Sequence, residues 1–184
     1  MNSGERRTLD GHTIRVLYSE EEVATRVQAI AGEIAAKNYE NLLVVSILKG
    51  SFIFAADLLR ALHKHDVRLE MDFMMLASYG KNLESSGQVQ ILRDIESSVR
   101  DRPVILIDDI LESGRTIAFA KDLIVARGAA SVESCVFLDK PGKRAAAIDA
   151  DFLGFSTPDL FVVGYGMDMA HSFRELPYVG VVET

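Results

Sequence analysis

The sequence lacks the features that would anchor the chain in a membrane, cross-link it or give it a local metal motif. Cys135 is the only cysteine, which excludes an internal disulfide framework and fits a reducing cytoplasm. No run reaches the roughly 18 apolar residues of a membrane span, and residues 1–10 show no secretory signal. The four histidines stand at no paired metal spacing. We therefore expect a cytoplasmic protein without a membrane partner.

Positive charge is also scarce. Lys and Arg total 20 against 27 Asp and Glu, a formal net charge of −7, so the overall field weakly repels nucleic acid and other polyanions. An acidic surface is also common where it serves only solubility. If the ligand is a phosphate, its attraction has to be local, from helix N-termini, a few basic side chains and a bridging cation. We expect no nucleic-acid partner.

The apolar runs of the chain alternate with helical patterns, and the length of 184 residues fits one domain, 1–184. Short apolar runs predict buried strands at 42–48, 104–107 and 132–138, and looser runs predict strands at 67–77 and 89–92. Helices are predicted at 19–38, from a capping box of Ser19 and Glu22; from Gly50 and Ser51 to about 63; and at 116–127, before Gly128. This alternation predicts an α/β fold, a parallel sheet flanked by helices on both faces. Ligands bind such sheets beyond the carboxyl ends of the strands.

The turn after the strand predicted at 104–107 is the most informative part of the sequence. Two adjacent carboxylates, Asp108 and Asp109, would repel each other unless a cation or hydroxyl-rich group lies beside them. A ribose diol bound to Mg²⁺ meets that need. Small residues then offer hydroxyls and backbone N–H groups at a helix N-terminus, which favours an anion: Ser113, Gly114 and Thr116. An ordinary N-capped turn would not explain the paired aspartates, so we predict a sugar-phosphate site.

Other phosphate and nucleotide motifs do not fit. The sequence has no GxxxxGK[ST] pattern, and Gly164 and Gly166 lack the third glycine of a dinucleotide fingerprint.

The stretch 108–116 resembles the phosphoribosyl-diphosphate-binding motif of the type I phosphoribosyltransferases. Further motifs resemble the hypoxanthine (6-oxopurine) branch of that family and occur in its order, from about residue 10 to the end of the sequence. They lie at 48–50, 78–80, 138–141 and 161–168, with Arg174 beyond. The resemblance implies a core at about 19–150 and a small hood subdomain made of 1–18 and 151–184.

The resemblance also implies a reaction in which a purine base replaces the pyrophosphate of phosphoribosyl diphosphate, giving a nucleoside 5′-monophosphate. Asp108 and Asp109 would hold the ribose hydroxyls and Mg²⁺, and Asp168 a second Mg²⁺. The implied 5′-phosphate site consists of Glu112, Ser113, Gly114, Arg115 and Thr116. The implied pyrophosphate site consists of Leu48, Lys49, Gly50 and Arg174, with Arg144 as a weaker candidate; in the family the peptide between Leu48 and Lys49 can be cis.

On the base side, the resemblance implies that Lys140 binds O6 of the purine, that Phe161 stacks on the ring and that the backbone of Val162 reads its edge. Ser78 and Tyr79 would open a mobile lid, 78–87, over the reacting centre. Such a lid would exclude water from an oxocarbenium-like transition state.

Position 112 departs from the family pattern. The family usually has an aspartate there as candidate base toward purine N7, whereas this chain has Glu112. The extra methylene can move the carboxylate by about 1 Å, a displacement that can lower a rate ~100-fold at a demanding site. We expect Glu112 to keep the role, because the two carboxylates have similar basicity.

Two alternatives remain open. A sister phosphoribosyltransferase that prefers guanine or xanthine would share these motifs, because selectivity depends on contacts near Lys140, Glu183 and Thr184. A regulator that senses phosphoribosyl diphosphate while binding nucleic acid is disfavoured by the net charge of −7 and the lack of a basic stripe. Because family members usually form dimers or tetramers, we expect a homodimer or homotetramer.

Overall fold

The structure is a computed structural model that describes residues 2–78 and 89–183. Six strands form the core sheet in the order β5-β4-β3-β6-β7-β8. Their bounds are β3 Leu42–Leu48, β4 Leu69–Ser78, β5 Val89–Arg93, β6 Pro103–Leu111, β7 Ser131–Asp139 and β8 Phe152–Ser156. All neighbours are parallel except β5, which runs antiparallel to β4 at the edge. The predicted parallel sheet is confirmed, with one antiparallel edge strand added.

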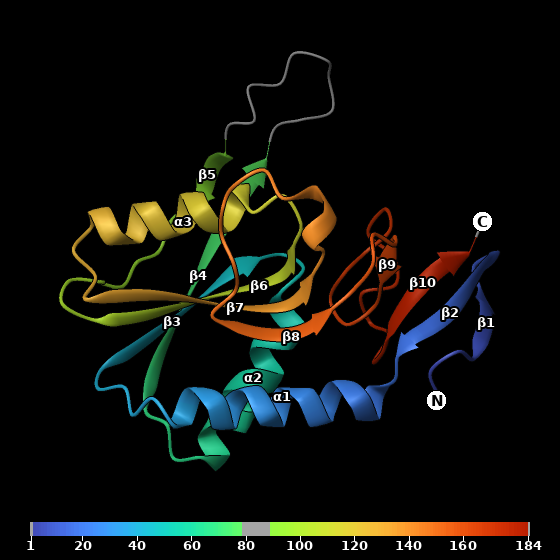
Figure 1. Ribbon diagram of the computed structural model, residues 1–184, viewed down its shortest axis with the longest axis horizontal. Helices are drawn as coiled ribbons and strands as arrows, with labels where there is room; N and C mark the ends of the chain where they lie inside the picture. The colour runs from blue at the N-terminus through green and yellow to red at the C-terminus, as the bar shows by residue number, and fades with distance from the viewer. Residues whose placement is uncertain (1, 79–88, 184) are drawn as a thin grey trace.

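Three α-helices cover the two faces of this sheet (Figure 1). They are α1 Glu20–Ala35, α2 Phe52–Lys64 and α3 Arg115–Ala126, and a short 3₁₀ helix, η1, spans Pro141–Lys143. α1 and α2 pack on one face and α3 on the other, so that the central strands are buried on both sides. The expected capping box begins α1: the Ser19 hydroxyl accepts from the Glu22 N–H at 3.2 Å, and the Glu22 carboxylate accepts from the Ser19 N–H at 2.8 Å.

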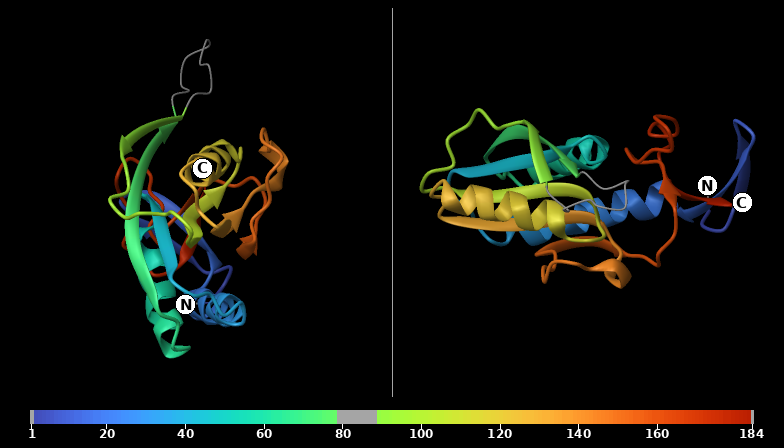
Figure 2. Two further views of the ribbon diagram at one scale, coloured as in Figure 1. Left: turned by 90° about the vertical axis from the view of Figure 1, so that its left-hand side faces the viewer. Right: turned by 90° about the horizontal axis from the view of Figure 1, so that it is seen from above.

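A second, antiparallel sheet joins segments from both ends of the described chain in the order β1-β2-β10-β9. Its strands are β1 Arg6–Leu9, β2 His12–Tyr18, β9 Val162–Val163 and β10 Val179–Glu183. It has its own small core of Ile14, Val16, Val163, Phe173 and Tyr178. It lies at one end of the molecule, toward which β7 and β8 point (Figure 1, Figure 2). We call this part the hood.

The boundary of the hood differs from the expected one. β8 pairs with β7 and therefore belongs to the core sheet, although the sequence had placed residues from 151 onward in the hood. Five residues with a mixed burial pattern form this edge strand, so no continuous apolar run marks it.

None of the helices among residues 2–78 and 89–183 is long and apolar enough to cross a membrane.

Candidate active site

The paired aspartates lie inside β6 rather than after it. The apolar run ends at Ile107, but pairing with β7 continues the strand, with Asp108 opposite Val136 and Leu111 opposite Asp139. Alternation along the strand starts the two side chains on opposite faces of the sheet, but the two carboxylates remain close enough to interact with each other. Burial and, secondly, the negative charge of Asp109 raise the pKa of Asp108 well above its ordinary value. A cation or hydroxyl-rich ligand would stabilise the ionised pair.

The loop after β3 lies directly against Asp109. A methyl group on Gly50 would stand 1.6 Å from Oδ2 of Asp109, so any larger residue would displace the carboxylate from this position. A methyl group on Gly166 would in turn stand 2.1 Å from the carbonyl oxygen of Gly50. The predicted pyrophosphate loop, the acidic pair and the turn before Asp168 therefore meet at one place. The peptide between Leu48 and Lys49 is cis, as the resemblance allowed.

Two buried serines, which were not among the predicted site residues, hold the loop that carries Lys49. The hydroxyls of Ser46 and Ser51 lie 2.7 Å apart, and the Ser51 hydroxyl donates to the carbonyl of Ile47 at 2.5 Å. Only Ser46 could have indicated this role from the sequence, because it is a polar residue inside an otherwise apolar strand. Lys49 itself is exposed.

The predicted phosphate loop begins α3. Gly114 is the N-cap residue with φ +78°, so the helix starts without a capping side chain. The nearest side chain to a methyl group at Gly114 would be Ile148, at 2.7 Å. The conformation and the neighbouring loop both require glycine here. The hydroxyl of Ser113 accepts from the Arg115 N–H at 3.4 Å, and Thr116 lies in the first turn of the helix.

The contacts of Arg144 do not fit its predicted role in pyrophosphate binding. Its guanidinium donates to the carbonyls of Leu111 and Glu112, both at 3.0 Å, and pairs with Asp139. These contacts occupy the guanidinium and hold the predicted phosphate loop in place, so Arg144 acts as a brace for that loop. The next residues extend this brace, because the N–H groups of Ala145 and Ala146 donate to the Ser113 carbonyl.

A pocket of about 500 Å³ opens between these loops and the hood. The predicted site residues that line it are Asp109, Glu112, Lys140, Phe161, Val162 and Asp168. Lys140 is 7% exposed and donates from Nζ to the carbonyl of Leu160 at 2.7 Å. Phe161 is 58% exposed, whereas Val162 is buried and pairs with Val181. One wall therefore offers a buried ammonium beside an open aromatic face.

Lys143 and Asp159, which are not among the predicted site residues, also line this pocket. The ammonium of Lys143 lies 3.3 Å from a Glu112 carboxylate oxygen and 2.8 Å from one of Asp159. Neither residue forms part of a spacing pattern that could have revealed the bridge.

The carboxylates of the pocket suit Mg²⁺ because they are few and separate. No group of three or more His, Cys, Asp or Glu side chains converges anywhere in the described chain. Asp168 instead pairs with Arg174 at 2.7 Å, and Arg174 also donates to the carbonyl of Gly166 at 2.6 Å. Mg²⁺ is commonly held by one or two carboxylates together with phosphate and water oxygens, rather than by a cage of protein ligands. Asp109 and Asp168 line one pocket and can supply such carboxylates.

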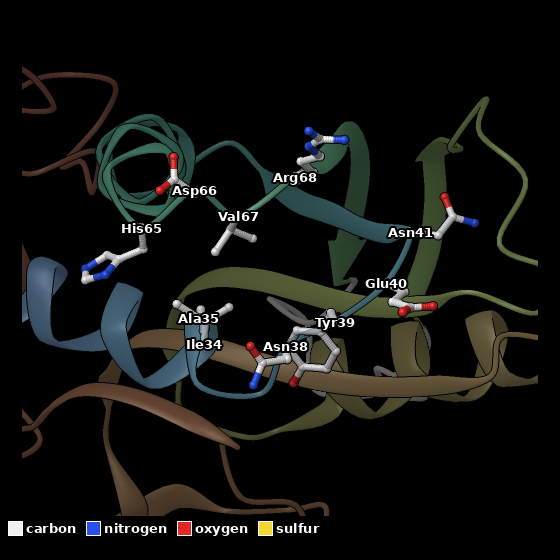
Figure 3. Close-up of a pocket in the computed structure, with 10 residues that line it drawn as sticks. All are labelled: Ile34, Ala35, Asn38, Tyr39, Glu40, Asn41, His65, Asp66, Val67 and Arg68. Atoms are coloured by element: carbon white, nitrogen blue, oxygen red, sulfur yellow. The ribbon is translucent and has the colours of Figure 1, made fainter.

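A second cavity, of about 420 Å³, lies at the other end of the core sheet. Figure 3 shows its lining from the ends of α1 and α2 and from the turns before β3 and β4. The side chains of His65 and Glu40 extend in opposite directions rather than toward a common point. It is lined by none of the predicted site residues.

The family model that describes the phosphoribosyl transferase domain matches residues 15–170 of the chain. The chain belongs to this family. It is 43% identical over 170 residues to the hypoxanthine-guanine phosphoribosyltransferase of Bacillus subtilis, covering 92% of this chain and 93% of that protein. A hypoxanthine phosphoribosyltransferase from Staphylococcus aureus is 39% identical and superimposes with a TM-score of 0.85, covering 92% of this chain and 91% of the other. The stated resemblance and the expected enzyme class, a phosphoribosyltransferase, are confirmed.

A longer relative shares almost the whole chain. This chain is 44% identical over 184 residues to the bifunctional protein TilS/HprT of Listeria innocua. The match covers 99% of this chain but only 28% of that relative.

One predicted motif lies largely outside the described residues. Ser78 is the last residue of β4, and Tyr79 and the rest of the expected lid lie in the segment that is not described. The lid remains a prediction.

Proposed function

We propose that the protein transfers the phosphoribosyl group of phosphoribosyl diphosphate to a 6-oxopurine, hypoxanthine or guanine, releasing pyrophosphate and forming the nucleoside 5′-monophosphate. One observation carries the proposal: a single pocket of about 500 Å³ joins Asp109 to Lys140 and Phe161. The N-terminus of α3, next to this pocket, offers its N–H groups to the 5′-phosphate. Attraction for a strongly anionic ligand is therefore local, despite the net charge of −7.

The ribose and its leaving group are assigned to the convergence of three loops. Asp108 and Asp109 accept hydrogen bonds from the ribose hydroxyls, and the loop of Lys49 and Gly50 holds the pyrophosphate together with Arg174. The contact between Gly50 and Asp109 supports this assignment, because the loop proposed for pyrophosphate and the acid proposed for ribose lie side by side. When bound, Mg²⁺ would neutralise charge on the diphosphate, held by Asp109 and Asp168.

The base is assigned to the wall formed by Lys140, Phe161 and Val162. Lysine has three donors and no acceptor, and the carbonyl of Leu160 uses one of those on Lys140. The remaining donors suit an oxygen at C6 of the purine, whereas an amino group there would leave a buried donor unpaired. Glu112 lines the same pocket and is the candidate base at N7. Glu183 pairs with Arg6 and Arg15 within the hood, so it is already engaged in ion pairs.

The test is an assay of purified protein with Mg²⁺, phosphoribosyl diphosphate and one base at a time: hypoxanthine, guanine, xanthine or adenine. Chromatography and mass spectrometry identify the nucleotide. We expect the monophosphate of hypoxanthine or guanine with equimolar pyrophosphate, and none from adenine. Lys140→Met is expected to lower kcat/KM for the base by about 10- to 100-fold, the effect of losing a hydrogen bond to a charged donor. Absence of any nucleotide from folded protein, with no calorimetric binding of phosphoribosyl diphosphate, would refute the proposal.

The role of Glu112 needs its own variants. Glu112→Ala should lower kcat by about 100-fold or more, as expected for a general base, while Glu112→Asp keeps part of the activity. Unchanged turnover in Glu112→Ala would remove the residue from the mechanism.

Compartment and assembly are also proposals. We propose a reducing cytoplasm, supported by the buried free thiol of Cys135. We propose a homodimer or homotetramer on the family resemblance alone; light scattering of the purified protein tests it, and a monomer would refute it.

A further inference from the structure

Lys143 connects the two sides of the base pocket. Its ammonium lies 2.8 Å from Oδ2 of Asp159 and 3.3 Å from Oε1 of Glu112. Glu112 belongs to the turn after β6, and Asp159 precedes the aromatic wall at Phe161. The bridge therefore spans the space between the phosphate loop and the base wall.

The following residue holds the same glutamate at its other end. Arg144 donates to the main-chain carbonyl of Glu112 at 3.0 Å and lies half-buried. Two consecutive basic residues at the end of η1 thus contact Glu112. Arg144 binds its backbone carbonyl and Lys143 binds its carboxylate.

The bridge contributes little to stability. The side chains of Lys143 and Asp159 are 56% and 49% exposed, and exposed ion pairs typically contribute little to the stability of a fold. Its effect on geometry is larger. Glutamate has one more rotatable bond than aspartate, so a free Glu112 carboxylate would occupy several positions, and a displacement of about 1 Å at a reacting centre can lower a rate ~100-fold.

We propose that Lys143 is a positioning residue, which holds the Glu112 carboxylate in place over the base and is itself anchored by Asp159. The proposal rests on the proposed function, in which Glu112 takes the proton at N7 of the purine. The proposal explains how a glutamate at this position can serve as general base: the ion pair restrains the longer side chain and keeps its carboxylate in one position.

The charge state of the bridge agrees with this role. Hydrogen bonds to Asp159 and then to Glu112 raise the pKa of Lys143 above its ordinary value. The ammonium therefore stays charged through the pH range of an enzyme assay.

The first experiment separates positioning from binding. Lys143→Met should lower kcat by about 3- to 5-fold, because an exposed ion pair cannot restrain the carboxylate by more than its own small free energy, with KM for the purine and for phosphoribosyl diphosphate within about twofold of wild type. Lys143→Arg should restore most of kcat, because it keeps the charge. A rise in KM for phosphoribosyl diphosphate at constant kcat would show direct substrate binding instead, and would overturn the proposal.

The second experiment is a double-mutant cycle. If Lys143 acts through the Glu112 carboxylate, Lys143→Met should cause no further loss of kcat in a Glu112→Gln background. An equal loss in both backgrounds would show that the lysine acts through Asp159 on the base wall, and would overturn the proposal.

The matched control is Lys37→Met. Lys37 is 53% exposed and pairs with Glu133 at 3.2 Å, far from the pocket, and this variant should keep wild-type kcat and KM.

The turnover of the wild-type protein distinguishes a failure of the proposed function from a failure of the proposed role of Lys143. An inactive wild type refutes the proposed function and the role of Lys143 with it, whereas an active wild type with unchanged kcat in Lys143→Met refutes only the role of Lys143.

Discussion

The cavity beyond the carboxyl ends of the core strands measures about 500 Å³, and the one at their amino ends about 420 Å³. At the carboxyl end, Asp108 is buried with a raised pKa, and Lys140 is buried with one carbonyl partner. At the amino end, the buried Arg102 donates to the carbonyl of Asn41 and to Glu70, and the Tyr39 hydroxyl donates to Glu133. The two ends therefore differ in their buried polar groups. The carboxyl end keeps a buried carboxyl group and a buried ammonium that a ligand would satisfy, whereas the buried guanidinium of Arg102 near the amino end is satisfied by the protein itself.

The largest expected effect is at Asp108. Asp108→Asn should lower kcat by about 10²- to 10³-fold, because it removes charge that stabilises the reacting ribose and its metal. The same change should raise the melting temperature of metal-free protein at pH 7. The folded pKa of Asp108 is raised, mainly by burial, so the folded state binds this proton more tightly, and stability is lost as pH rises above the unfolded value near 3.9.

Thermal melts between pH 3.5 and 8 in chelator, together with a turnover assay, measure both effects. The stability gain should shrink toward the acid end of that range. A melting temperature of Asp108→Asn below that of wild type at pH 7 would show that the buried carboxylate does not destabilise the metal-free protein, and would contradict the comparison of the two ends.

The second effect compares two glycines. Gly50→Ala should lower kcat about 100-fold, because its methyl group cannot coexist with Asp109 at 1.6 Å and the acid or the loop has to move by about 1 Å. Gly32→Ala, in α1 next to the amino-end cavity, meets only ordinary contacts at 3.8 Å or more. It should keep activity and stabilise the helix by about 0.5–1 kcal/mol. Equal kcat in the two variants would remove the distinction between the ends.

The third effect concerns stability alone. Arg102→Met should lower the free energy of unfolding by about 1–3 kcal/mol, because the carbonyls of Asn41 and of the buried Leu42 lose their donor. Turnover at a temperature where the variant is folded should stay within about twofold. Urea unfolding measures the first quantity, and Arg68→Met, an exposed residue of the same cavity, should change it by less than about 0.5 kcal/mol.

The smallest effect is a dependence on pH at the far end of α3. A hydrogen bond and ion pair with Arg127 lower the pKa of Asp94. The resulting stability is present above the unfolded pKa near 3.9 and is lost as pH falls through the lower folded value. It should amount to less than about 1 kcal/mol, because the carboxylate is 42% exposed. Urea unfolding of Asp94→Asn should match wild type at pH 3 and fall below it at pH 6; no difference at pH 6 would show that the pair contributes nothing.

The elements that carry a strong local pattern were predictable. The run 42–48 coincides with β3, and the capping box starts α1 where Ser19 and Glu22 indicated. The strand β6 was predicted too short, since its last residues are held by pairing with β7 and not by their own hydrophobicity. β8 was missed for the same reason.

The sequence by itself predicted a ribose-phosphate site, because paired carboxylates before a small-residue turn and a helix N-terminus suit that ligand, and the family resemblance added the residues proposed for a 6-oxopurine. Only the tertiary structure decided which of these groups meet. The contact between Gly50 and Asp109, the brace by Arg144 and the bridge from Lys143 to Glu112 and Asp159 join loops that are far apart in the chain. Such contacts depend on how the strands are ordered in the sheet and how the loops close over its edge, and no local spacing of residues encodes them.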